Sequence, residues 1–167
     1  MVAEIDLLFM REALALARKA WEEGEVPIGA LVVDEEGRVV GRGYNQPVHR
    51  CDPTAHAEVL ALREAAQNLG NYRLLGCTLY VTLEPCPMCA GALVYARVKK
   101  LIFGAFDPKC GACGSVFDVV RDPRLNHQLE VEGGLLEEEA KALLQGFFQE
   151  RRRRGARVVE GGGLESR

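Results

Sequence analysis

The sequence predicts an α/β protein built in three layers, an α/β/α sandwich with one sheet between two layers of helices. Helical and strand patterns alternate along the chain, and strands separated by helices of this length are typical of such sandwiches. The chain of 167 residues, with 48% hydrophobic content, is large enough for one domain with a sizeable core. We therefore expect a single domain over residues 1–154.

The domain is predicted to begin with a helix and a hairpin. Apolar residues recur at helical spacing over residues 4–22, and Gly24 with Pro27 ends that run. Residues 28–33 and 38–44 indicate two antiparallel strands joined at Glu36-Gly37. The elements predicted after the hairpin are a helix over 55–68, a strand over 77–83, a helix over 87–95, a strand over 100–104, a short helix over 116–120, a strand over 128–132, a helix over 135–153 and a disordered, glycine-containing tail over 155–167.

Composition points to a cytoplasmic protein. Acidic and basic residues interrupt the apolar N-terminus, unlike a secretory signal, and no apolar run approaches membrane-spanning length. Six cysteines without such a signal indicate a reducing compartment, where a C-x-x-C pair more often binds metal than forms a structural disulfide. The net charge of −3 argues against broad nonspecific affinity for nucleic acid.

Three residues have the types and spacing of a catalytic metal site. His56 lies two positions before Glu58, and 30 positions after His56 comes Cys86, followed by Cys89. Histidine and cysteine are usual zinc ligands, and three protein ligands leave one position of a tetrahedral ion open. Zinc lowers the pKa of a water in that position to about 7, which makes hydroxide available. With Glu58 placed to move protons, the pattern predicts a zinc hydrolase.

Helix geometry tests whether these groups can converge. Cys86 and Cys89 are three apart, so on a helix they share one face, and a helix N-terminus stabilises their thiolates. His56 and Glu58 lie about 200° apart around a regular helix, so they converge only from its first turn, with Thr54 as the predicted N-cap. Any one of these side chains alone fits an ordinary buried thiol or core histidine. The four groups together, at two predicted helix starts, argue against that alternative.

Short segments spread over residues 4–153 match the pattern of one enzyme family. They are Glu25-Val26-Pro27-Ile28-Gly29-Ala30, residues 52–58, 71–74, 79–86 and 103–105, Gly114-Ser115 and the Phe-Phe-x-x-Arg-Arg of 147–152. With the H-x-E…P-C-x-x-C pattern, they resemble the cytidine deaminase superfamily and, within it, the bacterial tRNA adenosine deaminases. The resemblance implies a cytidine deaminase-like fold with a mixed five-stranded sheet, one Zn²⁺ per chain and a homodimer.

The resemblance also implies a reaction. Hydroxide attacks C6 of the wobble adenosine in a tRNA(Arg) anticodon stem-loop, and inosine and ammonia are released. Glu58 takes the proton of the water, passes it to the ring nitrogen and protonates the leaving amino group. The backbone N–H groups of Ala57 and Cys86, at helix starts, are candidates to stabilise the developing polarity.

Residues that hold the substrate are predicted mainly by the resemblance. Asn45 is expected to hydrogen-bond the flipped base or its ribose, although an asparagine after a strand also suits an ordinary turn. Asp107 and Lys109 match positions near the flanking nucleotides, although Asp107-Pro108 is also a common turn signal. The pocket is expected to be lined by Val26, Pro27 and Ile28.

The last predicted helix carries an aromatic pair and a basic run. Phe147 and Phe148 are adjacent, so one ring can pack inward while the other reaches an unstacked base. Arg151 and Arg152 begin a run of four arginines that suits phosphates. The alternative is an aromatic pair in the core beside a solvated basic face. The resemblance favours the RNA-contacting interpretation.

One loop departs from the usual family pattern. Cys110 and Cys113 form a second C-x-x-C, which can bind another zinc, form a labile disulfide or hold two small thiols.

Two other functions stay open. A guanine-type deaminase of free bases shares the metal pattern. A catalytically silent RNA-binding or dimerisation subunit is the third possibility, but such a subunit has no chemical need for Glu58.

Overall fold

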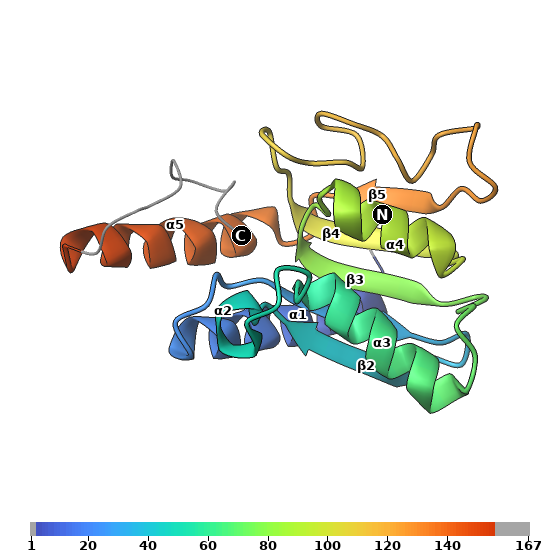
Figure 1. Cartoon of the computed structure of the whole chain (residues 1–167), viewed down its shortest axis with the longest axis horizontal. Coiled ribbons are helices and arrows are strands. Elements are labelled where there is room, and N and C mark those ends of the chain that lie inside the picture. The colour runs from blue at the N-terminus through green and yellow to red at the C-terminus, as the bar shows by residue number, and fades with distance from the viewer. Residues whose placement is uncertain (1–2, 156–167) are drawn as a thin grey trace.

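The computed structural model of the protein describes residues 3–155 and contains one mixed sheet between helices (Figure 1). The sheet has five strands in the order β2-β1-β3-β4-β5; β1 is antiparallel to β2 and β3, and β3, β4 and β5 are parallel. The strands are β1 Gly29–Val33, β2 Val39–Tyr44, β3 Thr78–Leu83, β4 Lys100–Ala105 and β5 Glu130–Gly133. The helices are α1 Glu4–Glu22, α2 Pro47–Arg50, α3 Ala57–Leu69, α4 Pro87–Tyr95 and α5 Glu137–Arg153.

The sheet separates two apolar layers, as side-chain alternation in strands requires. Leu31, Tyr80 and Ile102 pack with Met10 and Ala13 of α1 on one face. On the other face, α3 and α4 lie in front of the sheet in the view of Figure 1. Their buried residues share a cluster with those of the strands, among them Ala30, Val32, Leu79, Val81, Ala57, Ala61, Ala90 and Leu93. The predicted three-layer α/β/α sandwich is therefore confirmed.

Two glycines of β2 allow α3 to lie directly against the sheet. A Cβ atom at Gly41 would stand 2.2 Å from the carbonyl oxygen of Ala61, and one at Gly43 would stand 2.4 Å from that of Ala57. Both distances are far below van der Waals contact with backbone atoms that cannot give way. A side chain at either position would displace α3, and with it the start of the helix at His56.

The structure corrects three details of the sequence prediction. Residues 116–120 form no helix, because backbone bonds join them to residues 111–114, including an isolated bridge between Cys113 and Asp118. Helix α3 begins at Ala57 with His56 as its N-cap. Thr54 does not cap it, because its hydroxyl donates to Asp52 Oδ1 instead (2.7 Å). The short helix α2 was not predicted.

The predictions about the C-terminal tail and about membrane-spanning segments can be compared with residues 3–155 only. The predicted tail lies outside the described residues, apart from Gly155. Within residues 3–155, none of the helices combines the length and the apolar character needed to cross a membrane.

Candidate active site

The three predicted metal ligands meet where two helices begin. His56 is the N-cap of α3 and Cys86 the N-cap of α4, both with extended backbone (φ −75°, ψ 153° and φ −76°, ψ 174°). Cys89 is the third residue of α4 and is fully buried. Pro87 occupies the first turn of α4, where a missing backbone N–H costs nothing. Both helix N-termini therefore present their positive ends to one point.

The distances between the ligand atoms fit zinc. His56 Nδ1 lies 3.3 Å from Cys89 Sγ and 3.6 Å from Cys86 Sγ, and all three ligand atoms lie within 4.8 Å of one another. A tetrahedral zinc with Zn–S of about 2.3 Å and Zn–N of about 2.0 Å places nitrogen and sulfur about 3.5 Å apart. The side chains thus match this ion as they stand. No second cluster of three such residues occurs among the described residues.

Glu58 lies in the first turn of α3, beside the metal ligands in sequence and fully buried. The prediction that His56 and Glu58 converge required both to belong to the helix end. The N-cap position of His56 and the second helical position of Glu58 meet that requirement. A buried carboxyl group at a helix N-terminus beside a metal site is well placed to accept and return protons.

Asn45 joins the end of β2 to the start of α3. Its backbone N–H donates to the carbonyl of Ile28 (3.1 Å), and its Oδ1 accepts the N–H of Ala57 (2.9 Å). The side chain is fully buried, and Nδ2 has no hydrogen-bond partner among the described residues. The structure therefore corrects one expectation: the N–H of Ala57, predicted to stabilise polarity in the substrate, is already donated to Asn45.

The predicted apolar lining lies directly beside Asn45. Val26, Pro27 and Ile28 are all buried. The N–H of Ile28 donates to the carbonyl of Val26 (2.8 Å), which makes a tight turn around Pro27. Through Ile28, this turn is bonded to the backbone of Asn45. The location suits a pocket wall, and contact with substrate stays a prediction.

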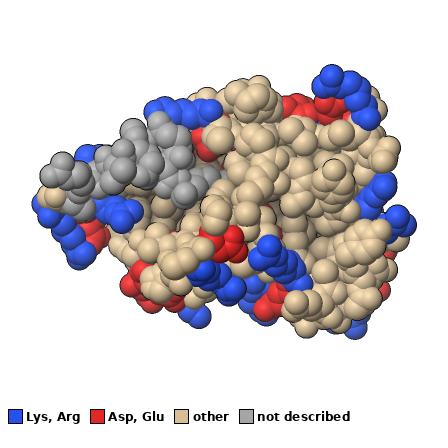
Figure 2. Space-filling model, in the orientation of Figure 1, with Lys and Arg blue, Asp and Glu red and all other residues tan. Residues whose placement is uncertain are grey.

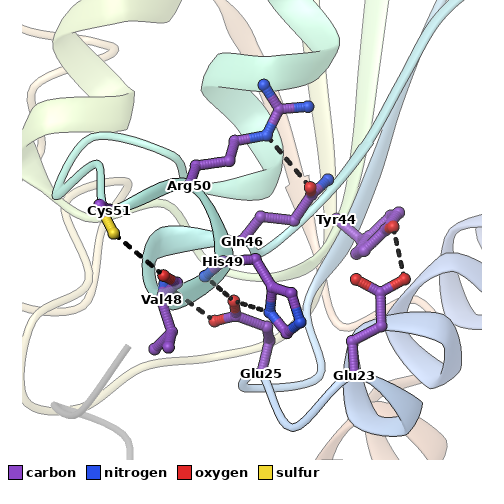
Figure 3. A network of polar contacts seen from close by, with 8 residues as sticks. All are labelled: Glu23, Glu25, Tyr44, Gln46, Val48, His49, Arg50 and Cys51. Carbon is purple, nitrogen blue, oxygen red and sulfur yellow. Dashed lines mark hydrogen bonds and ion pairs between the residues drawn. The ribbon is translucent and has the colours of Figure 1, made fainter.

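A buried carboxylate that sequence reasoning missed holds the segment after Asn45 (Figure 3). Glu25 is 2% exposed, and its two oxygens accept the backbone N–H groups of Val48 (3.3 Å) and His49 (2.8 Å) at α2. His49 Nδ1 also lies 2.8 Å from Glu25 Oε2. Its sequence signal was its place at the start of the Glu25–Ala30 segment of the family pattern, which did not indicate this role. Glu25 fixes the loop that connects Asn45 to His56.

The loop after β4 carries Asp107 and Lys109. Asp107 is fully buried, and its Oδ1 accepts the N–H groups of Lys109 (3.1 Å) and Cys110 (3.2 Å). Its Oδ2 has no partner among the described residues, whereas Lys109 is exposed. The two cysteines of this loop form no disulfide. Burial, and then the charges of Glu84 and Glu58, raise the pKa of the Cys113 thiol, which disfavours the thiolate that a second zinc would need.

Helix α5 corrects one substrate prediction. Phe147 and Phe148 are 4% and 5% exposed, so neither ring is presented to an unstacked base. Phe147 packs edge-on against Trp21, with ring centroids 5.6 Å apart, and Arg151 lies over the Phe147 ring at 5.0 Å. Adjacent helical residues are only about 100° apart, so both fit within one broad apolar stripe. Arg151 and Arg152 are exposed, as a phosphate-binding or a solvated face requires.

The mixed sheet, the His-Cys-Cys cluster at two helix starts and the adjacent Glu58 define a nucleobase deaminase with a cytidine deaminase-like fold. Residues 6–152 match the family of MafB19-like deaminases. The chain is 53% identical over 150 residues to the tRNA-specific adenosine deaminase of Haemophilus influenzae, covering 90% of this chain and 87% of that protein. With the Bacillus subtilis enzyme of the same name, the identity is 51% over 149 residues, covering 89% and 92%. The chain belongs to the tRNA-specific adenosine deaminases, within the MafB19-like deaminase family.

Solved structures agree with this assignment. A structure from a study of A-to-I editing by tRNA:A34 deaminases at the wobble position of transfer RNA superposes with a TM-score of 0.79 and 47% identity, covering 82% of this chain and 99% of that one. The guanine deaminase of Nitrosomonas europaea superposes with a TM-score of 0.72 and 29% identity, covering 88% and 85%. The fold is shared by both enzymes, and the sequence is more similar to the tRNA enzyme.

Proposed function

We propose that this protein is a zinc-dependent enzyme that converts the wobble adenosine of a tRNA(Arg) anticodon to inosine in the cytoplasm. The observation that carries the proposal is the spacing of His56, Cys86 and Cys89, whose ligand atoms lie within 4.8 Å of one another. Buried Glu58 follows His56 by two positions, in the first turn of the same helix. Relatives at about half identity are named tRNA-specific adenosine deaminases, which supports adenosine in RNA as the substrate. A reducing compartment keeps both cysteines available as ligands.

His56, Cys86 and Cys89 would hold one zinc ion per chain. Bound there, zinc supplies the Lewis acidity that makes a water molecule nucleophilic near neutral pH. In the reaction, the water oxygen bonds to C6 of adenine and the C6–N6 bond breaks. Glu58 takes a proton from the water and delivers it to ring nitrogen N1. It then carries the second proton to N6, which leaves as ammonia.

The flipped base would be held from the side of β2 and the loop before it. Asn45 Nδ2 is a buried donor without a partner among the described residues, and a base or ribose acceptor would satisfy it. The buried turn Val26–Ile28 would form the apolar wall beside it. Asp107 and Lys109 would contact the flanking nucleotides, and the exposed guanidinium groups of Arg151 and Arg152 would contact phosphates.

A homodimer is supported by an apolar surface on α4. Tyr72, Tyr95 and Leu125 are exposed around a groove of about 400 Å³ beside this helix, and Arg73 and Arg97 also line the groove. Figure 2 shows a broad area over α4 and the neighbouring loops without Lys, Arg, Asp or Glu. Exposed apolar patches of this kind mark interfaces. Tyr95→Asp should convert a dimer into monomers in sedimentation equilibrium, and a wild-type monomer would contradict this part of the proposal.

The proposal is tested by ammonia release from three substrates side by side: an arginine-tRNA anticodon stem-loop, free guanine and free cytidine. Glu58→Ala serves as the blank. Turnover of the stem-loop alone, with inosine found at the wobble position by sequencing, is the expected result. Turnover of guanine would instead assign the chain to the activity of its 29%-identical structural neighbour.

A further inference from the structure

Glu84 is a buried carboxylate that takes no part in the proposed reaction. It follows β3 directly, precedes Cys86 by two positions and is fully buried. Its carboxylate accepts four hydrogen bonds from one loop, residues 107–115. Oε1 accepts from the N–H of Asp107 (3.0 Å) and from Ser115 Oγ (2.5 Å), and Oε2 accepts from the N–H groups of Cys113 (3.0 Å) and Ser115 (3.0 Å).

The loop is folded tightly around this carboxylate. A Cβ atom at Gly111 would lie 2.4 Å from the Glu84 carboxyl carbon, so the loop closes only because a glycine stands there. Two backbone bonds fix the neighbouring main chain: Ala112 N–H donates to the carbonyl of Pro85 (2.8 Å), and Glu84 N–H donates to that of Ala105 (2.9 Å). Since Pro85 is adjacent to Cys86, the loop is fastened to the turn that supplies a metal ligand.

The bond to Asp107 has a consequence for the substrate. Asp107 Oδ1 accepts the N–H groups of Lys109 and Cys110, so the orientation of the aspartate and the start of the loop are coupled. Asp107 Oδ2 is buried without a partner among the described residues, which leaves one acceptor for a ligand. A small rotation of Asp107 would therefore move both this acceptor and Lys109.

We infer that Glu84 is a positioning residue that sets Asp107 and Lys109 relative to the metal ligands and thereby determines recognition of the nucleotides flanking the target base. The inference rests on the proposed function, because it requires a polynucleotide substrate. All four hydrogen bonds of the carboxylate go to the loop that carries Asp107. Glu84 therefore holds this loop in place and does not bond to the rest of the core through its carboxylate. Glu84 does not touch the reacting atoms.

The substitution Glu84→Gln isolates the Asp107 bond. An amide has one acceptor oxygen, and in the Oε2 position that oxygen keeps the N–H groups of Cys113 and Ser115. The NH₂ group then donates to Ser115 Oγ, because a hydroxyl oxygen can also accept a hydrogen bond. It faces the N–H of Asp107, however, and two donors cannot bond to each other, so this hydrogen bond is lost. In the reverse orientation the NH₂ group faces two backbone N–H donors, those of Cys113 and Ser115, so two hydrogen bonds are lost. The favoured arrangement of the variant therefore releases Asp107 alone.

Glu84→Gln and Ser115→Ala should be compared with Glu64→Gln. Glu64 makes the matched control because its Oε1 also accepts a backbone N–H, that of Arg42 (2.9 Å), on the exposed edge of the sheet. For the stem-loop substrate we expect KM to rise roughly tenfold in Glu84→Gln and about threefold in Ser115→Ala, the sizes expected when hydrogen-bonding groups are misplaced. The kcat and the zinc content should stay near wild type, and Glu64→Gln should leave all of these unchanged.

A double-mutant cycle identifies the route of the effect. If Glu84 acts through Asp107, the losses in kcat/KM of Glu84→Gln and Asp107→Ala are not additive, and replacing the nucleotides flanking adenosine matters less in both variants. The ¹⁵N–¹H signal of Asp107 should also shift in Glu84→Gln without substrate. Additive losses, a fall in kcat at unchanged KM, or an unmoved Asp107 signal would overturn the inference. If wild type does not deaminate the stem-loop, the proposed function fails, and the Asp107 signal still tests the structural link.

Discussion

The side-chain oxygen of Asn45 lies 2.9 Å from the backbone nitrogen of Ala57 and accepts its hydrogen bond, and this contact ties β2 to the helix start that carries His56 and Glu58. One side chain thus serves two purposes. Its oxygen fixes the catalytic helix, and its buried nitrogen is left for a ligand. If the nitrogen binds the substrate as proposed, stability and substrate binding are coupled at this position.

Asn45→Ala should lower both the stability of the fold and the affinity for the stem-loop. The variant leaves the N–H of Ala57 buried without its acceptor, which costs about 1–3 kcal/mol in the free energy of unfolding. KM for the stem-loop should rise as well, because the Nδ2 donor is removed. Urea denaturation and steady-state kinetics measure the two effects. Asn68→Ala is the control, since the Asn68 amide donates to the carbonyl of Val40 at an exposed site. Equal effects of both variants would contradict the role of Asn45.

Glu58→Gln should keep the metal and lose the reaction. The amide has nearly the same shape as the carboxylate, and Glu58 is not one of the three predicted ligands, so zinc should remain at one per chain. Without proton transfer, single-turnover deamination should slow by roughly 10²–10⁴-fold. Elemental analysis and quenched-flow kinetics provide the two measurements. A variant with normal turnover would show that another group moves the protons.

Loss of one metal ligand should abolish activity and lower thermal stability. Cys89 is fully buried among the ligands, so Cys89→Ala leaves His56 and Cys86 as an incomplete site. We expect zinc below one per chain, a lower Tm and no turnover, and treatment of wild type with a chelator should reproduce these changes. Cys51→Ala is the matched control because Cys51 is an exposed free thiol. Full activity in zinc-free protein would exclude the metal mechanism.

The cluster of His56, Cys86 and Cys89 could be predicted because its signals are local in sequence. The three-residue step from Cys86 to Cys89 and the two-residue step from His56 to Glu58 already restrict the ligands to helix starts. Glu25 and Glu84 could not be found in this way. Their bonds reach 23–31 positions along the chain, to loops whose path depends on the finished sheet. Hydrophobic periodicity carries no information about such polar pairs.

The errors in secondary structure have a similar origin. Val116, Phe117, Val119 and Val120 look like an apolar helix face, but β-branched residues favour extended backbone. In the fold, the N–H of Val119 donates to the carbonyl of Ala112 (2.9 Å), so partners elsewhere in the loop replace helical ones. Helix α2 has only four residues and is held by Glu25, so its own sequence gives little signal.

Alkaline pH should destabilise the fold through Cys77. Burial, reinforced by Asp34, Glu35 and Glu36, raises the pKa of this thiol from 9.0 to about 11. Since the folded state favours the protonated thiol, the stabilisation is complete below pH 9 and is lost as pH rises through 11. The free energy of unfolding of wild type should therefore fall over this range by more than that of Cys77→Ala. Denaturation at about pH 8, 9, 10 and 11 tests this, and parallel curves would contradict it.

The arginines at the end of α5 should contribute to RNA affinity through phosphates. Arg151 and Arg152 are exposed, and Arg151 is held over the Phe147 ring, which orients its guanidinium group. If each arginine binds one phosphate, Arg151→Ala/Arg152→Ala should weaken stem-loop binding and reduce the slope of log K against log salt concentration by about 0.7 for each phosphate that is no longer neutralised. Arg38→Ala/Arg124→Ala controls for total charge, because it also removes two arginines, each exposed and paired with an aspartate away from α5. A salt slope equal to that of wild type would assign the basic run to a solvated helix face.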